Sequence, residues 1–254
     1  MPFIDNEKRV LFAKNGEPYY YKTICSVETL RENPQVIEAL NRLAIESEED
    51  LSRSLQDKGQ RLKTPLTYEN SWKVDEKWLD TFEETSKSIA LVEDTNGKLI
   101  ALTAFMVNDK ATRVNLGIDE DYIIFIKALT DKAHRNTGVI TSLLGEVMKE
   151  VKDHLCVGCV SIKTAINEEG EEFDYVMNLP RYAQMFKKTF ENNKLQVRCE
   201  SPMGTQRGEE KIELDSIIES NSINQQTLST IITSQRAQAL AGDKKLVGFY
   251  IHGK

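Results

Sequence analysis

The chain has 254 residues, of which 40% are apolar and 29% are charged, a balance typical of globular proteins with ample material for a core. Its formal net charge of −7 argues against general nucleic-acid binding, which depends on neutralising phosphates with lysine and arginine. The four cysteines are too few for a disulfide scaffold, no apolar run approaches a membrane span, and no secretory signal opens the chain. We therefore expect a cytoplasmic protein that binds neither nucleic acid nor membrane.

The N-terminal part predicts one strand followed by helices. Residues 1–18 show no firm pattern and are expected to form an extension, whereas the aromatic, β-favouring run at 19–24 predicts a strand. Ser26 can then cap a helix, and Pro34 interrupts or restarts it.

Helical spacing of apolar residues continues beyond Pro34 as far as Ala44. A separate helix is predicted after Ser47, closing near Gly59, and a further helix is predicted from Asp75.

A β-hairpin is the clearest local signal in the sequence. Residues 88–93 and 98–107 are β-rich, and the Asn96–Gly97 pair between them strongly favours a tight turn. Because the apolar run at 122–126 reads as a further strand, we expect three antiparallel strands in succession, which disfavours a doubly wound nucleotide-binding fold.

The stretch from 122 to 153 organises the chain. Its strand leads through the loop at 134–138 into a helix whose apolar residues form one stripe at a period of 3.6. Asn136 or Thr137 can cap this helix, and Gly138 permits a close approach of the backbone. Free N–H groups at the positive end of a helix dipole make such a loop a natural phosphate seat.

This stretch resembles the acetyl-CoA-binding segment of the GNAT superfamily of N-acetyltransferases, whose signature is Gln/Arg-x-x-Gly-x-Gly/Ala. Arg135 and Gly138 match it, while Ile140 stands where the family has a small residue. The alternative is that Ile140 is a core residue and the loop is only a capped helix start. The resemblance implies that acetyl-CoA, as co-substrate, is held by strand backbone and by the loop, at Ala128, Leu129, Thr130, Arg135, Asn136, Thr137, Gly138, Val139 and Ile140.

The resemblance also implies the fold class. We expect an α/β (α+β) GNAT-like fold with a central mixed, mostly antiparallel sheet flanked by helices, and a strand after the phosphate helix that splays from its neighbour. Downstream, a strand at 156–166, an acidic loop, a helix and further strands are predicted. A single domain over 1–254 is expected, with an insertion at 201–244 before the last strand.

Two residues are candidates for catalysis. The family often uses a carboxylate at its fourth strand as base, and Glu120 is the choice among the acidic residues at 119–121; the alternative is a solvated acidic turn. The family's acid is a Tyr on the helix after the fifth strand, where this chain has Phe186 or Lys187. Tyr182, one turn earlier, could substitute, as could Tyr175; the alternative is that Tyr182 packs with its hydroxyl at the surface, the commoner fate of a helix tyrosine.

The function implied by the resemblance is transfer of an acetyl group to a primary amine, either a small molecule or a protein lysine or N-terminus. The alternatives are a GNAT-like scaffold without acetylation activity and an acyltransferase that uses a longer acyl-CoA. No metal is expected, because Cys156 and Cys159 lack the second pair that a structural zinc needs. The oligomeric state stays open, with a homodimer among the alternatives.

Overall fold

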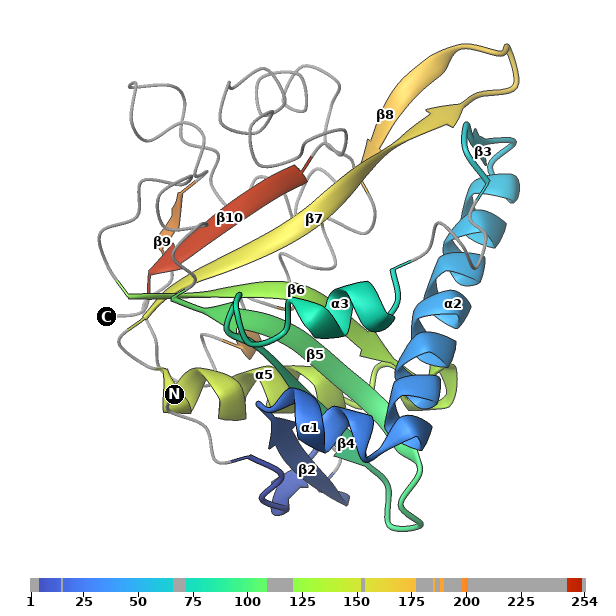
Figure 1. Ribbon diagram of the computed structural model, residues 1–254. Coiled ribbons are helices and arrows are strands. Elements are labelled where there is room, and N and C mark those ends of the chain that lie inside the picture. The colour runs from blue at the N-terminus through green and yellow to red at the C-terminus, as the bar shows by residue number, and fades with distance from the viewer. Residues whose placement is uncertain are drawn as a thin grey trace.

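The computed structural model describes residues 5–14, 16–65, 72–108, 121–151, 154–176, 185, 188–189, 198–200 and 246–252. Within them, helices lie on both faces of one large sheet (Figure 1). The strands are β1 (Arg9–Phe12), β2 (Pro18–Ile24), β3 (Arg61–Leu62), β4 (Lys87–Glu93), β5 (Leu99–Val107), β6 (Tyr122–Thr130), β7 (Leu155–Ile166), β8 (Glu172–Val176), β9 (Arg198–Glu200) and β10 (Leu246–His252). The helices are α1 (Val27–Arg31), α2 (Pro34–Gln56), α3 (Glu76–Asp80), the short 3-10 helix η1 (Lys132–His134) and α5 (Val139–Glu150).

The sheet is mixed and mostly antiparallel, which confirms the predicted fold class. Its strand order is β1-β2-β4-β5-β6-β7-β10-β9, with β3 and β8 also paired to β7. Among the paired strands of the described ranges, β6 and β7 alone run parallel. Since α5 connects these two strands, it forms the crossover that a parallel pair requires.

An apolar core lies on each face of the sheet. On one face, α5 packs Leu143 and its apolar stripe against Phe105 and Phe125, whose rings lie 6.0 Å apart. On the other face, α1, α2 and α3 pack against β4 and β5 around the fully buried Leu40 and Phe82. None of the helices in the described ranges is long and apolar enough to cross a bilayer.

The local signals of the sequence are confirmed where capping and turn chemistry set them. The Ser26 hydroxyl accepts the backbone N–H of Thr29 at 3.1 Å and caps α1, and Asp75 caps α3 in the same way. The hairpin of β4 and β5 turns at Asn96 and Gly97, with Gly97 at φ +80°, a conformation that glycine adopts without strain.

The predicted break in α2 is wrong, because α2 is one continuous helix through Ser47. The apolar stripe runs on from Leu43 and Ala44 to Leu51 at helical spacing, so the packing holds the helix together. A single serine in a helix interior costs well under about 1 kcal/mol and does not interrupt it. The acidic stretch after β7 is likewise not all loop, because β8 begins at Glu172 and pairs with β7.

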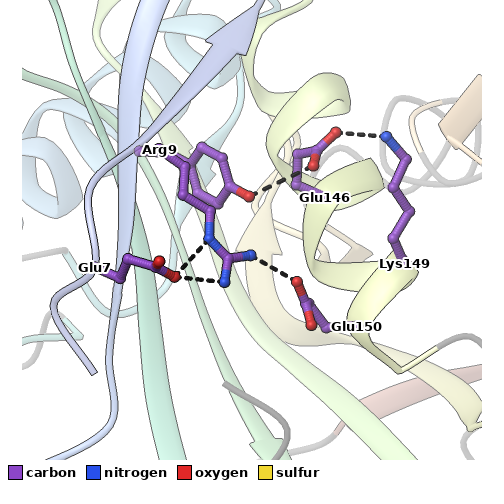
Figure 2. A network of polar contacts seen from close by, with 6 residues as sticks. Glu7, Arg9, Glu146, Lys149 and Glu150 are labelled. Atoms are coloured by element: carbon purple, nitrogen blue, oxygen red, sulfur yellow. Dashed lines mark hydrogen bonds and ion pairs between the residues drawn. The ribbon is translucent and has the colours of Figure 1, made fainter. Parts of the chain in front are cut away.

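The N-terminal extension contains a strand that the sequence did not indicate. β1 pairs antiparallel with β2, and Figure 2 shows how its Arg9 joins the strand to α5. The Arg9 guanidinium donates to Glu7 at 2.6 Å and to Glu150 at 2.7 Å, while Lys149 donates to Glu146 at 2.6 Å. These pairs are largely exposed, so they fix geometry more than they add stability.

Candidate functional site

The most distinctive feature of the sheet is the divergence of β6 from β7. Parallel pairing covers only the segment from Tyr122 opposite Leu155 to Phe125 opposite Gly158. β6 continues beside β5 to Thr130, whereas β7 turns away toward β3 and β8 (Figure 1). Among the described strands, none pairs with β6 on this side beyond Phe125, and this unpaired edge reaches Thr130, over about 13 Å at strand rise.

A bulge marks the start of this unpaired edge. The register of β5 with β6 shifts between Ala104 and Phe105, which leaves Ile126 as an inserted residue. Past the bulge, the Thr103 hydroxyl donates to the carbonyl of Lys127 at 3.0 Å and fixes the strand. A bulge changes the direction in which the following residues point, so the backbone groups of β6 after Ile126 face differently from those before it.

The hydrogen-bond pattern shows which groups face the divergence. The backbone N–H of Asp131 donates to the Ile100 carbonyl at 2.7 Å, in the register that pairs Leu129 with β5. Because backbone groups alternate in an antiparallel ladder, the N–H and C=O of Ala128 and Thr130 point to the other side. These are two of the predicted cofactor-binding positions, and their backbone lines the open edge; Leu129, between them, bonds to β5.

Asp131 anchors the loop that leaves β6. Its buried carboxylate accepts the backbone N–H of Ala133 at 3.0 Å and the Lys98 ammonium at 2.9 Å. Burial acts to raise the pKa of Asp131, but Lys98, the Ala133 N–H and Arg42 outweigh it and lower the pKa below its ordinary value. The loop therefore starts from a fixed, ionised residue at neutral pH.

Arg135 connects this loop to α2. Its Nε donates to the carbonyl of Thr130 at 3.3 Å, and its Nη1 lies 2.5 Å from Oδ2 of Asp50. Burial acts to raise the pKa of Asp50, but the hydrogen bond and charge of Arg135, helped by Lys132 and Arg53, lower it overall. Arg135 thus stands at the open end of the divergence, between β6 and α2.

The start of α5 differs from the predicted cap. The N-cap residue is Gly138, which has no side chain to accept a hydrogen bond; the Thr137 hydroxyl accepts the Val139 N–H at 3.4 Å and donates to the His134 carbonyl at 2.7 Å. Asn136 has a positive φ of 66° instead of a capping conformation. The Ser142 N–H makes the first helical bond, to Gly138, so the N–H groups before it lack helical acceptors and face the loop.

Gly138 makes its close approach to the β1–β2 connection. A Cβ at this position would lie 2.9 Å from Cβ of Lys14, and the residue has φ +86°. Gly138→Ala should therefore lower stability by about 1–2 kcal/mol for the left-handed backbone, plus the cost of displacing Lys14. The matched control is Gly97→Ala, where φ is +80° but no atom lies within 4 Å. Equal losses of Tm in the two variants would contradict a role for the Lys14 contact.

Val139 and Ile140 begin the apolar stripe of α5. Val139 is fully buried, and Ile140 is partly buried and packs against the same core. The packing of Ile140 therefore supports its interpretation as a core residue, although the side chain is only partly buried.

Glu48 is a buried residue that the sequence analysis missed. It is 5% exposed on α2, its Oε1 lies 3.7 Å from Nζ of Lys127, and its Oε2 has no hydrogen-bond partner among the described residues. The available signal was its place on the apolar stripe, four residues after Ala44 and three before Leu51. A carboxylate buried in such a position is destabilising, so it is expected to have either a binding partner or a functional role.

The two predicted catalytic residues, Glu120 and Tyr182, lie outside the described residues, as do Phe186 and Lys187. Within the described ranges, no group of three or more His, Cys, Asp and Glu side chains is placed to hold a metal ion.

No protein-family model matches the chain, and no curated protein matches it significantly. A solved structure described as histone acetyltransferase HPA2 and related acetyltransferase, from Corynebacterium glutamicum, is 16% identical with a TM-score of 0.24; the match covers 29% of this chain and 44%, less than half, of that one. A proposed phosphinothricin N-acetyltransferase is 13% identical with a TM-score of 0.38, covering 92% and 99% of the two chains. A proposed acetyltransferase from Acinetobacter baylyi is 19% identical with a TM-score of 0.34, covering 56% and 70%.

All three TM-scores lie below 0.5, so the fold assignment rests on the topology of the chain itself. The order of a strand, helices and three antiparallel strands, then the crossover helix α5, is the order expected from the GNAT resemblance. The divergence of β7 from β6 is also the one that the resemblance implies. The chain has a GNAT-like fold.

Proposed function

We propose that the protein is an N-acetyltransferase that moves an acetyl group from acetyl-CoA to a primary amine. The observation that carries the proposal is the unpaired edge of β6, which ends at the loop that opens α5. An extended chain with amide groups can add to such an edge as a strand does, and a phosphate suits the helix start. Acetyl-CoA carries both groups, joined end to end.

The residues present fit this co-substrate. The backbone N–H and C=O of Ala128 and the N–H of Thr130 would pair with the amides of the pantetheine arm, while the Thr130 carbonyl accepts from Arg135. The N–H groups at the start of α5, with the positive end of its dipole, would hold the pyrophosphate, and Arg135 and Lys132 add positive charge beside them. The thioester would then lie at the closed end of the divergence, near Lys127.

Direct transfer needs a group that takes a proton from the amine and a group that protonates the departing thiolate. Glu120 and Tyr182 stay our predictions for these roles from the sequence. A tyrosine of ordinary pKa, near 10, is protonated at neutral pH and can donate. The net negative charge of the chain suits a cationic acceptor, either a small amine or a protein lysine or N-terminus.

A binding or regulatory scaffold without transfer is the second candidate, and a longer acyl-CoA the third. The second is favoured by Ile140, which is partly buried at a position where the family signature has a small residue. Ligand binding alone would not separate these functions, so the test must also follow the thiol product.

The test is titration calorimetry with acetyl-CoA, followed by measurement of free thiol in the presence of a panel of primary amines. We expect binding by the full chain and amine-dependent thiol release. Binding without release for any amine would favour the scaffold. Release with a longer acyl-CoA but not with acetyl-CoA would favour the third candidate. Absence of binding to each acyl-CoA would overturn the proposal.

A further inference from the structure

Glu48 is the strongest unexplained group in the described structure. Its carboxylate lies within the apolar face of α2, and burying a carboxylate without full compensation is destabilising. Among the described residues, its ion-pair partner is Lys127, and their 3.7 Å separation is longer than a hydrogen bond. A carboxylate in this state has an unused acceptor oxygen inside the protein.

The position of Glu48 in the fold gives this oxygen a context. α2 contacts β6 and then β3, so it runs along the diverging ends of β6 and β7 (Figure 1). Lys127 is the first residue after the inserted Ile126 of the bulge, where the unpaired edge of β6 begins. Glu48 therefore lies against the closed end of the divergence, whereas Asp50 and Arg135 lie at its open end.

The surroundings of Glu48 already accommodate a primary ammonium group. Nζ of Lys127 lies beside the carboxylate and 5.9 Å from the ring centroid of Trp72, a distance suited to a cation–π contact. A carboxylate and an aromatic face are the groups that recognise an alkylammonium ion in general.

We propose that Glu48, in place of Glu120, binds the protonated amine of the acceptor through Oε2 and takes its proton as general base. This inference rests on the proposed acetyl transfer and assigns the acceptor class as a primary amine that arrives as a cation. Lys127, through its ion pair with Oε1, orients the carboxylate, so it is a positioning residue.

The chemistry balances with these groups. The ammonium gives one proton to Glu48, and the freed nitrogen forms a C–N bond with the acetyl carbonyl carbon while the C–S bond breaks. The second proton leaves the nitrogen for the departing thiolate, and Glu48 releases its proton to solvent. The products are the acetamide, the free thiol and one proton.

The decisive variant is Glu48→Gln, which keeps the shape and removes the base. We expect kcat/KM for the amine to fall about 10²–10⁴-fold, while the affinity for acetyl-CoA is unchanged. The matched control is Glu49→Gln, an exposed residue next along α2, which should retain full activity. Lys127→Met should lower activity less than Glu48→Gln does. Glu120→Gln tests the other carboxylate in the same assay. If Glu120→Gln loses its activity while Glu48→Gln keeps full activity, the inference is overturned.

Stability separates a functional role from a structural one. A carboxylate oxygen without a partner adds little to folding, so Glu48→Gln should leave Tm unchanged or raise it. Should Tm and activity both fall, the double variant Glu48→Met with Lys127→Met decides, because apolar replacement of a buried ion pair is commonly neutral or stabilising. Restored Tm with activity still lost supports the inference, and restoration of both overturns it. A double variant that does not regain Tm shows a structural carboxylate and also overturns it.

Amine binding distinguishes failure of this inference from failure of the proposed function. Thermal shifts of the wild type and of Glu48→Gln would be measured with phenylethylamine, putrescine and Nα-acetyl-lysine amide as probes. If the wild type releases no thiol but an amine raises its Tm and that shift disappears in Glu48→Gln, the amine site stands and the transfer function fails. If thiol is released and Glu48→Gln matches the wild type, the transfer function stands and this inference fails. If no thiol is released and no amine shifts the Tm of the wild type, both the transfer function and this inference are overturned.

Discussion

Ala128→Pro should weaken acetyl-CoA binding by about tenfold or more while the protein remains folded. The N–H of Ala128 faces the divergence and does not bond to β5, so proline removes a donor that no described strand uses. Loss of one hydrogen bond costs about 0.5–1.5 kcal/mol, and the proline ring adds bulk at the same edge. Titration calorimetry on the variant measures the change directly.

The control is the neighbouring residue. The N–H of Leu129 points to β5, in register with Leu102, so Leu129→Pro removes a ladder bond and should cost about 3 kcal/mol or more. The two variants should therefore give opposite results, with Ala128→Pro losing affinity at nearly constant Tm and Leu129→Pro losing Tm. Unchanged affinity in Ala128→Pro would argue against strand-like pairing of the co-substrate with β6.

Leu55→Ala should destabilise the protein by about 2–5 kcal/mol, the range for truncating a fully buried leucine. Leu55, Leu51 and Leu62 form a separate small cluster, through which the C-terminal turns of α2 pack against β3. Because β3 pairs with the end of β7, this cluster holds the two sides of the divergence together. Hydrogen exchange should show faster opening of α2 beyond Glu48.

Leu40→Ala provides the comparison, since Leu40 is equally buried but lies in the main core beneath the sheet. We expect a similar loss of Tm, with increased exchange spread over the whole domain. Uniform exchange in Leu55→Ala as well would mean that α2 and its cluster open only with the rest of the protein.

The sequence predicted those elements whose signals are local. The Asn96–Gly97 turn, the Ser26 cap and the stripe of α5 each depend on residues close in the chain. Ser47 was misleading, because the packing of Leu51 and its neighbours extends α2 through it. Propensity is a weak guide wherever tertiary contacts decide.

The candidate site was less accessible to sequence reasoning. The loop at Arg135 and Gly138 was found through a motif, but the bulge at Ile126 depends on the register with β5, which no local pattern encodes. The burial of Glu48 depends on α2 lying against β6, a contact between segments far apart in the chain. Its charge was visible as an exception on an apolar stripe, yet its partner was not.

The ion pair of Arg135 with Asp50 has a consequence for how binding of one substrate affects the affinity for the other. Asp50 and Glu48 are two residues apart on α2, one reaching the loop proposed to hold phosphate and the other the closed end of the divergence. A pyrophosphate would compete with Asp50 for the Arg135 guanidinium, so its binding would weaken the ion pair that joins α2 to the loop. Linkage requires that any such effect on amine affinity be matched by an equal effect of the amine on co-substrate affinity. The two ligands should therefore bind as a coupled pair, and Asp50→Asn should make their affinities independent.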